Sequence, residues 1–320
     1  MPGGSKGPLI LWHMEVLIVC PANCTTGGPE ALHAFASGLN KMDGIHARLW
    51  SWNITSYPPQ PAEYAAYGCE YVTDIPADFD GIIVYPEIWA NHALDYPQYT
   101  RAVYWLGIDA YASWNLRDAG AFLADDSIIH IAQSAYAYDF LRRLRVSRLL
   151  MCTDLLNADF YAEYGEQERT NEVLYNPAKA TPFQRRLMEA CHGITFKPIT
   201  GMTREQVIDA MHHAKLYIDF GKFPGRERMP REAILCGCCV VSSKIGAAAY
   251  YADFPHHYKF DSKDGHIWAI VNTIHYVLHN FDTCSGDFEI ARMRLRAERD
   301  LVPEQVKEVA DAFQYYHPGA

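Results

Sequence analysis

The feature that most constrains the fold is a short, uninterrupted apolar run at residues 238–241, bounded by Gly237 and by two serines. A run of this length without a polar residue is typical of a strand that is buried on both faces of a parallel sheet. A second apolar run at 215–220 precedes it, and a charged loop and a short helical pattern lie between the two. The order strand, loop, helix, strand predicts a parallel α/β unit.

The charged loop of this unit contains Pro230, whose fixed φ and missing N–H suit the first turn of a helix. Gly237 suits the left-handed position after the end of that helix. Glu232 is then predicted in the first turn, at the edge of the sheet where open parallel sheets bind ligands. There it either complements the helix dipole, a role worth about 0.3–1 kcal/mol, or contacts a ligand.

Three arginines, Arg226, Arg228 and Arg231, crowd into the same loop. The planar guanidinium group matches phosphate, and an acidic chain does not need three such groups here for solubility. We therefore expect a local phosphate site, with Arg226 and Arg228 as its candidate ligands. One of the two can instead form an ion pair with Glu227.

The composition limits the class of protein. A chain of 320 residues with 49% hydrophobic and 21% charged residues is expected to fold throughout into two domains, apart from its ends. The formal net charge of −10 argues against a general nucleic-acid binder, which needs a broad basic surface. Any phosphate binding is therefore expected to be local.

The nine cysteines are scattered, and several fall within predicted strands. They are typical of reduced core residues in a cytoplasmic protein, and the cluster at 236–239 lacks the second cysteine pair of a zinc site. No apolar run reaches the length of about 18 residues that a membrane span requires. We expect a cytoplasmic protein without a transmembrane segment, in which residues 1–13 are a tag or an upstream extension.

Predicted strands and helices alternate along the whole chain. The strands are expected at 16–20, 47–52, 81–85, 102–106, 127–131, 148–152, 173–175, 194–199, 215–220 and 238–241. A polar stretch at 157–172 carries few apolar residues and is the predicted junction. The sequence therefore predicts two doubly wound α/β domains, at 14–156 and 173–320.

A glycine turn follows the first predicted strand, and Pro29 opens a helix directly after Gly27 and Gly28. Backbone N–H groups at such a helix start bind anions, and glycines let a ligand approach the main chain. The turn lacks the G-x-G-x-x-G pattern of a dinucleotide site. It is either an anion site or a tight turn alone.

The second half resembles the GT-B glycosyltransferases, in particular the glycogen-synthase and mannosyltransferase-like group. The resemblance is carried by REAILCGCCVVSSKIGAAAYY, with Glu232-Ala233, Cys236-Gly237 and Val240-Val241 in the corresponding places, and it extends over residues 173–280. The first half is similar, more loosely, to polysaccharide-assembly glycosyltransferases through PANCTTGGPEALHAFASGLN and IIVYPEI. The resemblance implies two Rossmann-like domains that face each other across a cleft.

The resemblance also implies roles for individual residues. The second glutamate of the family's E-x7-E motif contacts the ribose of the nucleotide, and Glu232 matches it. Lys179 matches the basic residue that holds the diphosphate, and Gly28 matches the glycine loop that approaches from the opposite domain. The first motif glutamate is replaced by Pro224, so the donor-sugar contact is either missing or made by Glu227.

The implied activity is transfer of a sugar from a UDP- or GDP-linked donor to a carbohydrate or lipid-linked acceptor, in surface polysaccharide or glycoconjugate synthesis. Basic side chains with helix termini are expected to replace a metal ion, so no cofactor is predicted. Two alternatives stay open. One is an inactive GT-B module that binds sugars or scaffolds a partner, because Pro224 replaces a motif glutamate; the other is a sugar-nucleotide epimerase.

The candidate catalytic residues lie in the first half. Glu87 and His92 follow the strand at 81–85, where an acceptor hydroxyl would bind, and Asp109 follows the strand at 102–106. Histidine titrates near neutral pH and is apt as a general base. Each of the three can equally be an ordinary loop residue.

Overall fold

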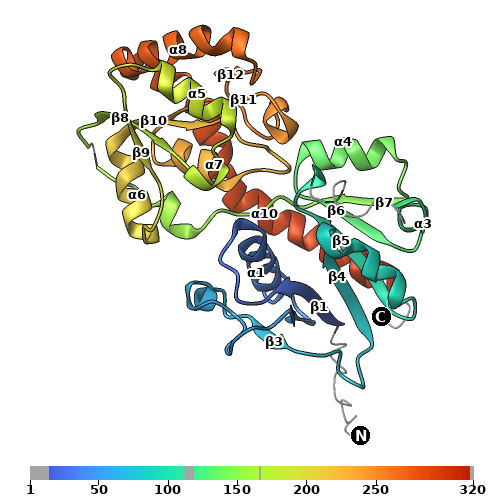
Figure 1. The fold of residues 1–320 in the computed structure, drawn as a ribbon. Coiled ribbons are helices and arrows are strands. Elements are labelled where there is room, and N and C mark those ends of the chain that lie inside the picture. The colour runs from blue at the N-terminus through green and yellow to red at the C-terminus, as the bar shows by residue number, and fades with distance from the viewer. Residues whose placement is uncertain (1–13, 110, 112–118, 166, 318–320) are drawn as a thin grey trace, which may run out of the picture.

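The computed structural model describes residues 14–109, 111, 119–165 and 167–317. Two wholly parallel sheets, each flanked by helices, form two domains that face each other (Figure 1). The predicted α/β class with two doubly wound domains is confirmed. Residues 1–13, expected to be a tag or an extension, lie outside the described residues.

The first domain is built on a seven-stranded sheet of order β3-β2-β1-β4-β5-β6-β7. Its strands are β1 Met14–Pro21, β2 Ile45–Trp52, β3 Glu70–Val72, β4 Gly81–Pro86, β5 Thr100–Trp105, β6 Ile129–Ala132 and β7 Arg148–Met151. Its helices are α1 Gly27–Leu39, α3 Ala119–Leu123 and α4 Ala135–Arg143, with 3-10 turns η1 Ala62–Tyr67 and η2 Glu87–Asp95. Separate apolar cores cover the two faces, so β1 and β4 are buried on both sides, as their apolar runs predict.

The second domain is built on a five-stranded sheet of order β12-β11-β10-β8-β9. Its strands are β8 Thr170–Tyr175, β9 Thr195–Pro198, β10 Ala214–Asp219, β11 Cys239–Ser243 and β12 Lys259–Phe260. Its helices are α5 Pro182–Ala190, α6 Arg204–His213, α7 Arg228–Leu235, α8 Ile267–His279, α9 Phe281–Gly286 and α10 Glu289–Tyr316. Short 3-10 turns are η3 Ala158–Tyr161, η4 Pro177–Lys179, η5 Gly246–Ala249 and η6 Asp264–His266. The predicted junction at 157–172 contains η3 and, from Thr170, the start of β8.

Each strand predicted from the sequence overlaps an observed strand, whereas β3 and β12 were not predicted. These two are edge strands of three and two residues, and neither is fully buried, so they carry no continuous apolar run. Helix α7 begins at Arg228, which places Pro230 in its first turn as predicted. Glu232 lies in the second turn rather than the first, so the expected position of Glu232 was wrong by part of a turn.

Helix α10 crosses from the second domain to the first (Figure 1). Leu295, near its start, belongs to the core of the second domain. Val302, Val309 and Phe313, further along, belong to the core of the first domain, on the face of the sheet that α1 also covers. The helix therefore completes two cores in turn.

This crossing corrects the predicted extent of the second domain, 173–320. The part of α10 from Val302 to Phe313 packs in the first domain. The amphipathic pattern of α10 shows that one of its faces is buried, but the same pattern suits either sheet. The sheet that α10 covers depends on the path of the chain, which the amphipathic pattern does not reveal.

The two domains are joined through successive strand ends of the first sheet. After β5, the Ile108 N–H donates to the carbonyl of Pro224 at 2.8 Å. After β6, the Gln133 side chain accepts the Arg226 N–H at 3.1 Å. The Asp253 carboxylate accepts the N–H groups of the first turn of α4, at 2.8 and 3.0 Å. The second domain thus covers the β5 to β7 side of the first sheet's carboxyl edge.

Among the helices in the described residues, none is long and apolar enough to cross a membrane.

Candidate functional site

The predicted donor side is assembled at the carboxyl ends of β8 and β10. Lys179 ends η4, a turn fixed by the Asn176 side chain, which accepts the Ala178 N–H at 3.0 Å. The Lys179 ammonium donates to the carboxylate of Glu227, the residue that precedes α7. The structure therefore brings Lys179 and Glu227, which are far apart in the sequence, into direct contact.

Glu232 is 8% exposed, on the α7 face near this pair. Its closest cation is Arg228, whose Nε lies 3.6 Å from Glu232 Oε1. Burial raises the pKa of Glu232, and the charge of Arg228 opposes that rise. No hydrogen bond to the Glu232 carboxylate is found in the described part of the chain, so this buried acceptor has unused capacity.

Asp219, which ends β10, is a polar group of this site that sequence reasoning missed. Its carboxylate accepts the Gly221 N–H at 2.9 Å and the Tyr217 hydroxyl at 3.4 Å. Burial raises the pKa of Asp219, while the Gly221 N–H and the charge of Lys179 lower it. A Cβ at Gly221 would lie 2.9 Å from Asp219 Oδ1 and 3.2 Å from the Lys179 carbonyl, so a larger residue in this turn would displace the Asp219 carboxylate. The signal for Asp219 was a carboxylate that interrupts an apolar run at its end.

Two further lysines were also missed. Lys222 follows β10 and Lys244 follows β11, and both are exposed. In the described residues, neither side chain has an ion pair or hydrogen bond. Because β11, β10 and β8 are neighbours in the sheet, Lys244, Lys222 and Lys179 form a row along its carboxyl edge, which we call the lysine row. The signal was one lysine within a few residues of the end of each strand.

The arginines of the charged loop have a different environment from the one predicted. Arg231 is 1% exposed, and its Nη2 lies 2.8 and 3.0 Å from the two oxygens of Asp154. Burial pushes the pKa of Asp154 up, but the positive charges of Arg231, Arg228 and Arg226 outweigh it and hold the pKa below its usual value. These residues form a buried ionic network between the domains.

Arg226 belongs to this network. Its guanidinium lies 2.5 Å from Glu298 of α10 and 2.5 Å from the Thr153 hydroxyl, and its side chain is 5% exposed. Carboxylates within the protein already pair with Arg226, and its predicted phosphate contact stays a prediction. Arg228 lies 3.1 Å from Asp154 and 3.5 Å from Glu30, so it too is held by the protein.

The glycine turn of the first domain lies opposite this region. Helix α1 begins at Gly27, and Thr26 provides no side-chain cap for its N-terminus. A Cβ at Gly27 would lie 3.0 Å from Arg228 Cδ, whereas a Cβ at Gly28 would meet nothing closer than 3.9 Å. Gly28 thus lies at an N-terminus whose N–H groups have no side-chain cap, as an anion site requires.

Glu30, in the first turn of α1, links the domains and was not predicted. Its carboxylate accepts Arg204 of α6 and the Tyr67 hydroxyl, each at 3.0 Å. Beside this link, an apolar cavity of about 340 Å³ runs between α1, α10 and residues 152–159. Neither Lys179 nor Glu232 lines it, so the cavity is separate from the donor-side residues.

The three candidate catalytic residues are not brought together, since no hydrogen bond or ion pair among the described residues joins them. Glu87 is 5% exposed, and its carboxylate accepts the Leu106 N–H at 3.0 Å. Burial raises the pKa of Glu87 to about 7, against the effect of that N–H. Asp109 accepts the Tyr136 hydroxyl at 2.9 Å, near the contact with the second domain. Both residues therefore hold loops at the junction.

His92 is different because it remains open to solvent. Its side chain is 43% exposed, and its Nδ1 lies 2.8 Å from Asp95 Oδ2. A histidine whose one ring nitrogen is held by a carboxylate presents the other to a ligand. Of the three candidates, His92 has the geometry of a proton acceptor.

The chain matches no protein-family model and no curated protein sequence. Solved structures do match it. HepE from Anabaena, in complex with UDP-glucose, matches with a TM-score of 0.70 at 13% identity, over 94% of this chain and 100% of HepE. A glycosyltransferase from Rickettsia africae matches with a TM-score of 0.66 at 10% identity, over 96% of this chain and 100% of that one.

Sucrose-phosphate synthase from Thermosynechococcus elongatus matches with a TM-score of 0.65 at 12% identity, over 94% of this chain and 99% of the synthase. The likeness spans both domains in each case, and at these identities it establishes architecture. The two Rossmann-like domains of this chain and its likeness to these glycosyltransferase structures lead to the same conclusion about the fold. The chain has the fold of the GT-B glycosyltransferases.

Proposed function

We propose that the protein is a glycosyltransferase that takes a sugar from a nucleotide-linked donor, with UDP or GDP as the nucleotide. The observation that carries the proposal is the Glu232 carboxylate, which is buried, lacks a hydrogen-bond donor in the described part of the chain and lies beside the lysine row. Such a group suits the two hydroxyls of a ribose. The likeness to HepE in complex with UDP-glucose supports this proposal.

The diphosphate of the donor would lie between the domains. On one side, the lysine row offers ammonium groups, of which Lys222 and Lys244 have no carboxylate partner in the described residues. On the other side, the uncapped N-terminus of α1 at Gly28 offers N–H groups. These groups would stabilise the charge of the departing diphosphate in place of a metal ion. Glu227, held by Lys179, would contact the donor sugar in place of the glutamate that Pro224 replaces.

The transfer itself breaks the bond between the sugar's anomeric carbon and the diphosphate oxygen and forms a bond from that carbon to an acceptor hydroxyl. The acceptor, a carbohydrate or a lipid-linked glycan, would lose its hydroxyl proton to a base. His92 is the candidate base, because Asp95 holds its Nδ1 at 2.8 Å and leaves Nε2 as the proton acceptor. The nucleoside diphosphate leaves with the electron pair.

A panel of UDP- and GDP-sugars tests the donor assignment through thermal unfolding. A donor present at 100 times its dissociation constant adds about 2.7 kcal/mol to the free energy of unfolding, which raises the melting temperature measurably. Release of UDP or GDP from the donor then separates an enzyme from an inactive module, and product analysis separates transfer from epimerisation. A panel without any shift favours the inactive GT-B module.

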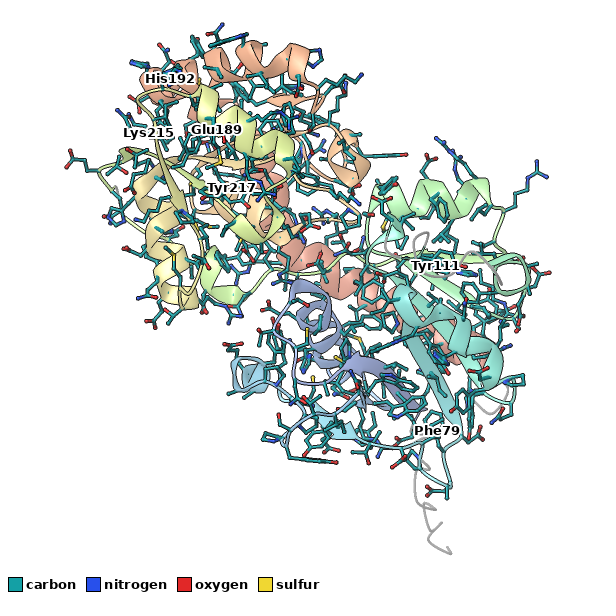
Figure 2. The ribbon with its side chains drawn as sticks, viewed as in Figure 1. Phe79, Tyr111, Glu189, His192, Lys215 and Tyr217 are labelled. Atoms are coloured by element: carbon teal, nitrogen blue, oxygen red, sulfur yellow. The ribbon has the colours of Figure 1, made fainter. Side chains whose placement is uncertain are left out.

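Lys179→Ala sharpens the test. We expect the affinity for the nucleoside diphosphate to fall about tenfold by calorimetric titration, since a charge-assisted hydrogen bond is lost. The matched control is Lys215→Ala, at the start of β10 and so at the opposite edge of the same sheet; Figure 2 shows Lys215 farther from the first domain than Tyr217 of the same strand. Unchanged affinity in Lys179→Ala would remove this lysine from the donor site.

A further inference from the structure

A group of aromatic side chains lies at the carboxyl edge of the first sheet and has no role in the donor site. Trp52 ends β2, and Trp89 and His92 lie in η2, which follows β4. The ring centroids of Trp52 and Trp89 are 5.6 Å apart, and those of Trp52 and His92 are 5.4 Å apart. We call these three side chains the aromatic platform.

The platform lies on the part of the edge that the second domain leaves open. The second domain holds residues that follow β5, β6 and β7, through Ile108, Gln133 and Thr153. It also contacts Glu30 of α1, which follows β1, through Arg204 and Arg228. The platform follows β2 and β4, the strands on either side of β1. In the described residues, no hydrogen bond or ion pair joins a platform side chain to the second domain. A molecule can therefore reach the platform while the domains stay in contact.

The exposure of the platform distinguishes it from core packing. Trp105, which lies in the core of the same domain, is 0% exposed and donates its indole N–H to His130. Trp52 and Trp89 are only partly buried, and neither indole N–H has a hydrogen bond in the described structure. Trp52 packs on Trp50, and both Trp52 and Trp89 pack against the core cluster, so their rings are supported from behind. These supported and partly exposed rings, inclined to one another by 45° and 42°, offer aromatic faces on which a ligand can pack.

The polar surroundings indicate what kind of ligand fits. The 53–59 loop continues from Trp52 and is fixed by Asn23, whose side-chain oxygen accepts the N–H groups of Thr55 and Ser56 at 3.0 and 3.1 Å. Asp95 holds His92 at the platform. A pyranose ring meets both requirements, since its C–H face packs on the electron-rich face of an aromatic ring while its hydroxyls bond to polar neighbours. A hydrocarbon chain would leave those polar groups unused.

We propose that the aromatic platform binds a carbohydrate acceptor, with a sugar ring stacked on the face of Trp89, the inclined ring of Trp52 beside it and a hydroxyl directed at His92. This inference rests on the proposed glycosyl transfer and chooses the carbohydrate over a lipid as the group that the protein recognises. Trp52 and Trp89 are then positioning residues for the acceptor, and the donor residues act independently of them.

The test uses Trp89→Leu in the full chain, because leucine keeps apolar bulk at this half-buried position but removes the flat ring. The acceptors are maltose, cellobiose, lactose and N,N′-diacetylchitobiose, compared with farnesyl phosphate as a lipid, each with the donor that gives the largest thermal shift. We expect the KM for the active disaccharide to rise about tenfold, while the KM for the donor and its slow hydrolysis are unchanged. The control Trp268→Leu removes a 67% exposed tryptophan on α8 and should change neither KM.

Two outcomes overturn the proposal: transfer to a disaccharide with an unchanged acceptor KM in Trp89→Leu, or transfer to farnesyl phosphate but to no disaccharide. Both leave the proposed glycosyl transfer intact. A separate titration of the disaccharides without donor, followed by tryptophan fluorescence, tests whether the platform binds a saccharide even if the protein transfers no sugar. Saccharide binding that Trp89→Leu weakens, together with no transfer from any donor, would contradict the proposed enzyme activity while supporting the platform. If Trp89→Leu unfolds, Trp89→Phe gives the milder version of the same comparison.

Discussion

The charged stretch at 226–232 supplies two adjacent regions with opposite electrostatic character. In the buried network, Arg231 and Arg226 meet carboxylates within 2.8 Å, and the pKa of Asp154 falls. Beside the lysine row, the closest cation to Glu232 is Arg228 at 3.6 Å, and burial raises the pKa of Glu232. Ion pairs at 2.5 and 2.8 Å mark charges that hold the domains together, whereas the longer 3.6 Å pair leaves the Glu232 carboxylate for a ligand. The density of charge in a sequence does not distinguish the two.

The strongest way to break the comparison is Arg231→Met. Asp154 would lose its closest cation and remain buried, so we expect the free energy of unfolding to fall by about 3–5 kcal/mol, measured by chemical denaturation. The double variant Asp154→Leu, Arg231→Met removes both charges and should recover most of that loss. Arg185→Met, on the exposed side of α5, is the control. A loss below about 1 kcal/mol in the single variant would show that the network does not hold the domains.

The pH dependence of Glu87 tests a buried carboxyl that has no cation. Burial raises its pKa from 4.5 to about 7, so the folded state holds a proton that the unfolded state releases. This contribution to stability is fully present below about pH 4.5 and is lost as the pH rises to about 7, a total of about 3 kcal/mol. Glu87→Gln should flatten this part of the stability curve, measured by denaturation from pH 4.5 to 8. Parallel curves for the two proteins would place the Glu87 pKa near its ordinary value.

The smallest expected effect is that of Glu232→Gln on nucleotide binding. The neutral amide loses a charge-assisted acceptor worth about 1.5–3 kcal/mol, so affinity for the nucleotide should fall tenfold or more. The melting temperature should change little, because the Glu232 carboxylate accepts no hydrogen bond among the described residues and its ion pair with Arg228 is 3.6 Å long. The alternative role, a complement to the helix dipole, weakens beyond the first turn, and Glu232 lies in the second. A destabilised protein with wild-type affinity would exclude Glu232 from the donor site.

The fold was predictable because parallel strands buried on both faces leave continuous apolar runs in the sequence. The capping box at Thr203 and Gln206, at the start of α6, was also predictable, because its two residues lie three positions apart in the sequence. The contacts of Arg226 were not predictable, because its partners Thr153 and Glu298 lie 73 and 72 residues away in the chain. The partner of a long charged side chain depends on which residues lie close to it in the folded protein, and a single sequence does not show this.

The contacts of the predicted site likewise include some that the sequence foreshadows and some that it does not. Lys179 and Glu227 meet because each follows the end of a neighbouring strand, which strand order makes foreseeable. Lys222 and Asp219 obey the same rule and could have been found by it. The partner of His92, Asp95, lies within the same short turn, whereas the link from Glu30 to Arg204 spans the two domains and leaves no local signal.

The path of α10 has a consequence for how the protein is made. Val302, Val309 and Phe313 complete the core of the first domain, yet they follow every strand of the second sheet in the chain. Domains generally fold in the order of their synthesis, the N-terminal one first. Here the first domain emerges from the ribosome with one face of its sheet incompletely covered, and it must wait until the second has been translated. The domain that is translated first is therefore completed last, once α10 covers the open face of β1 and β4.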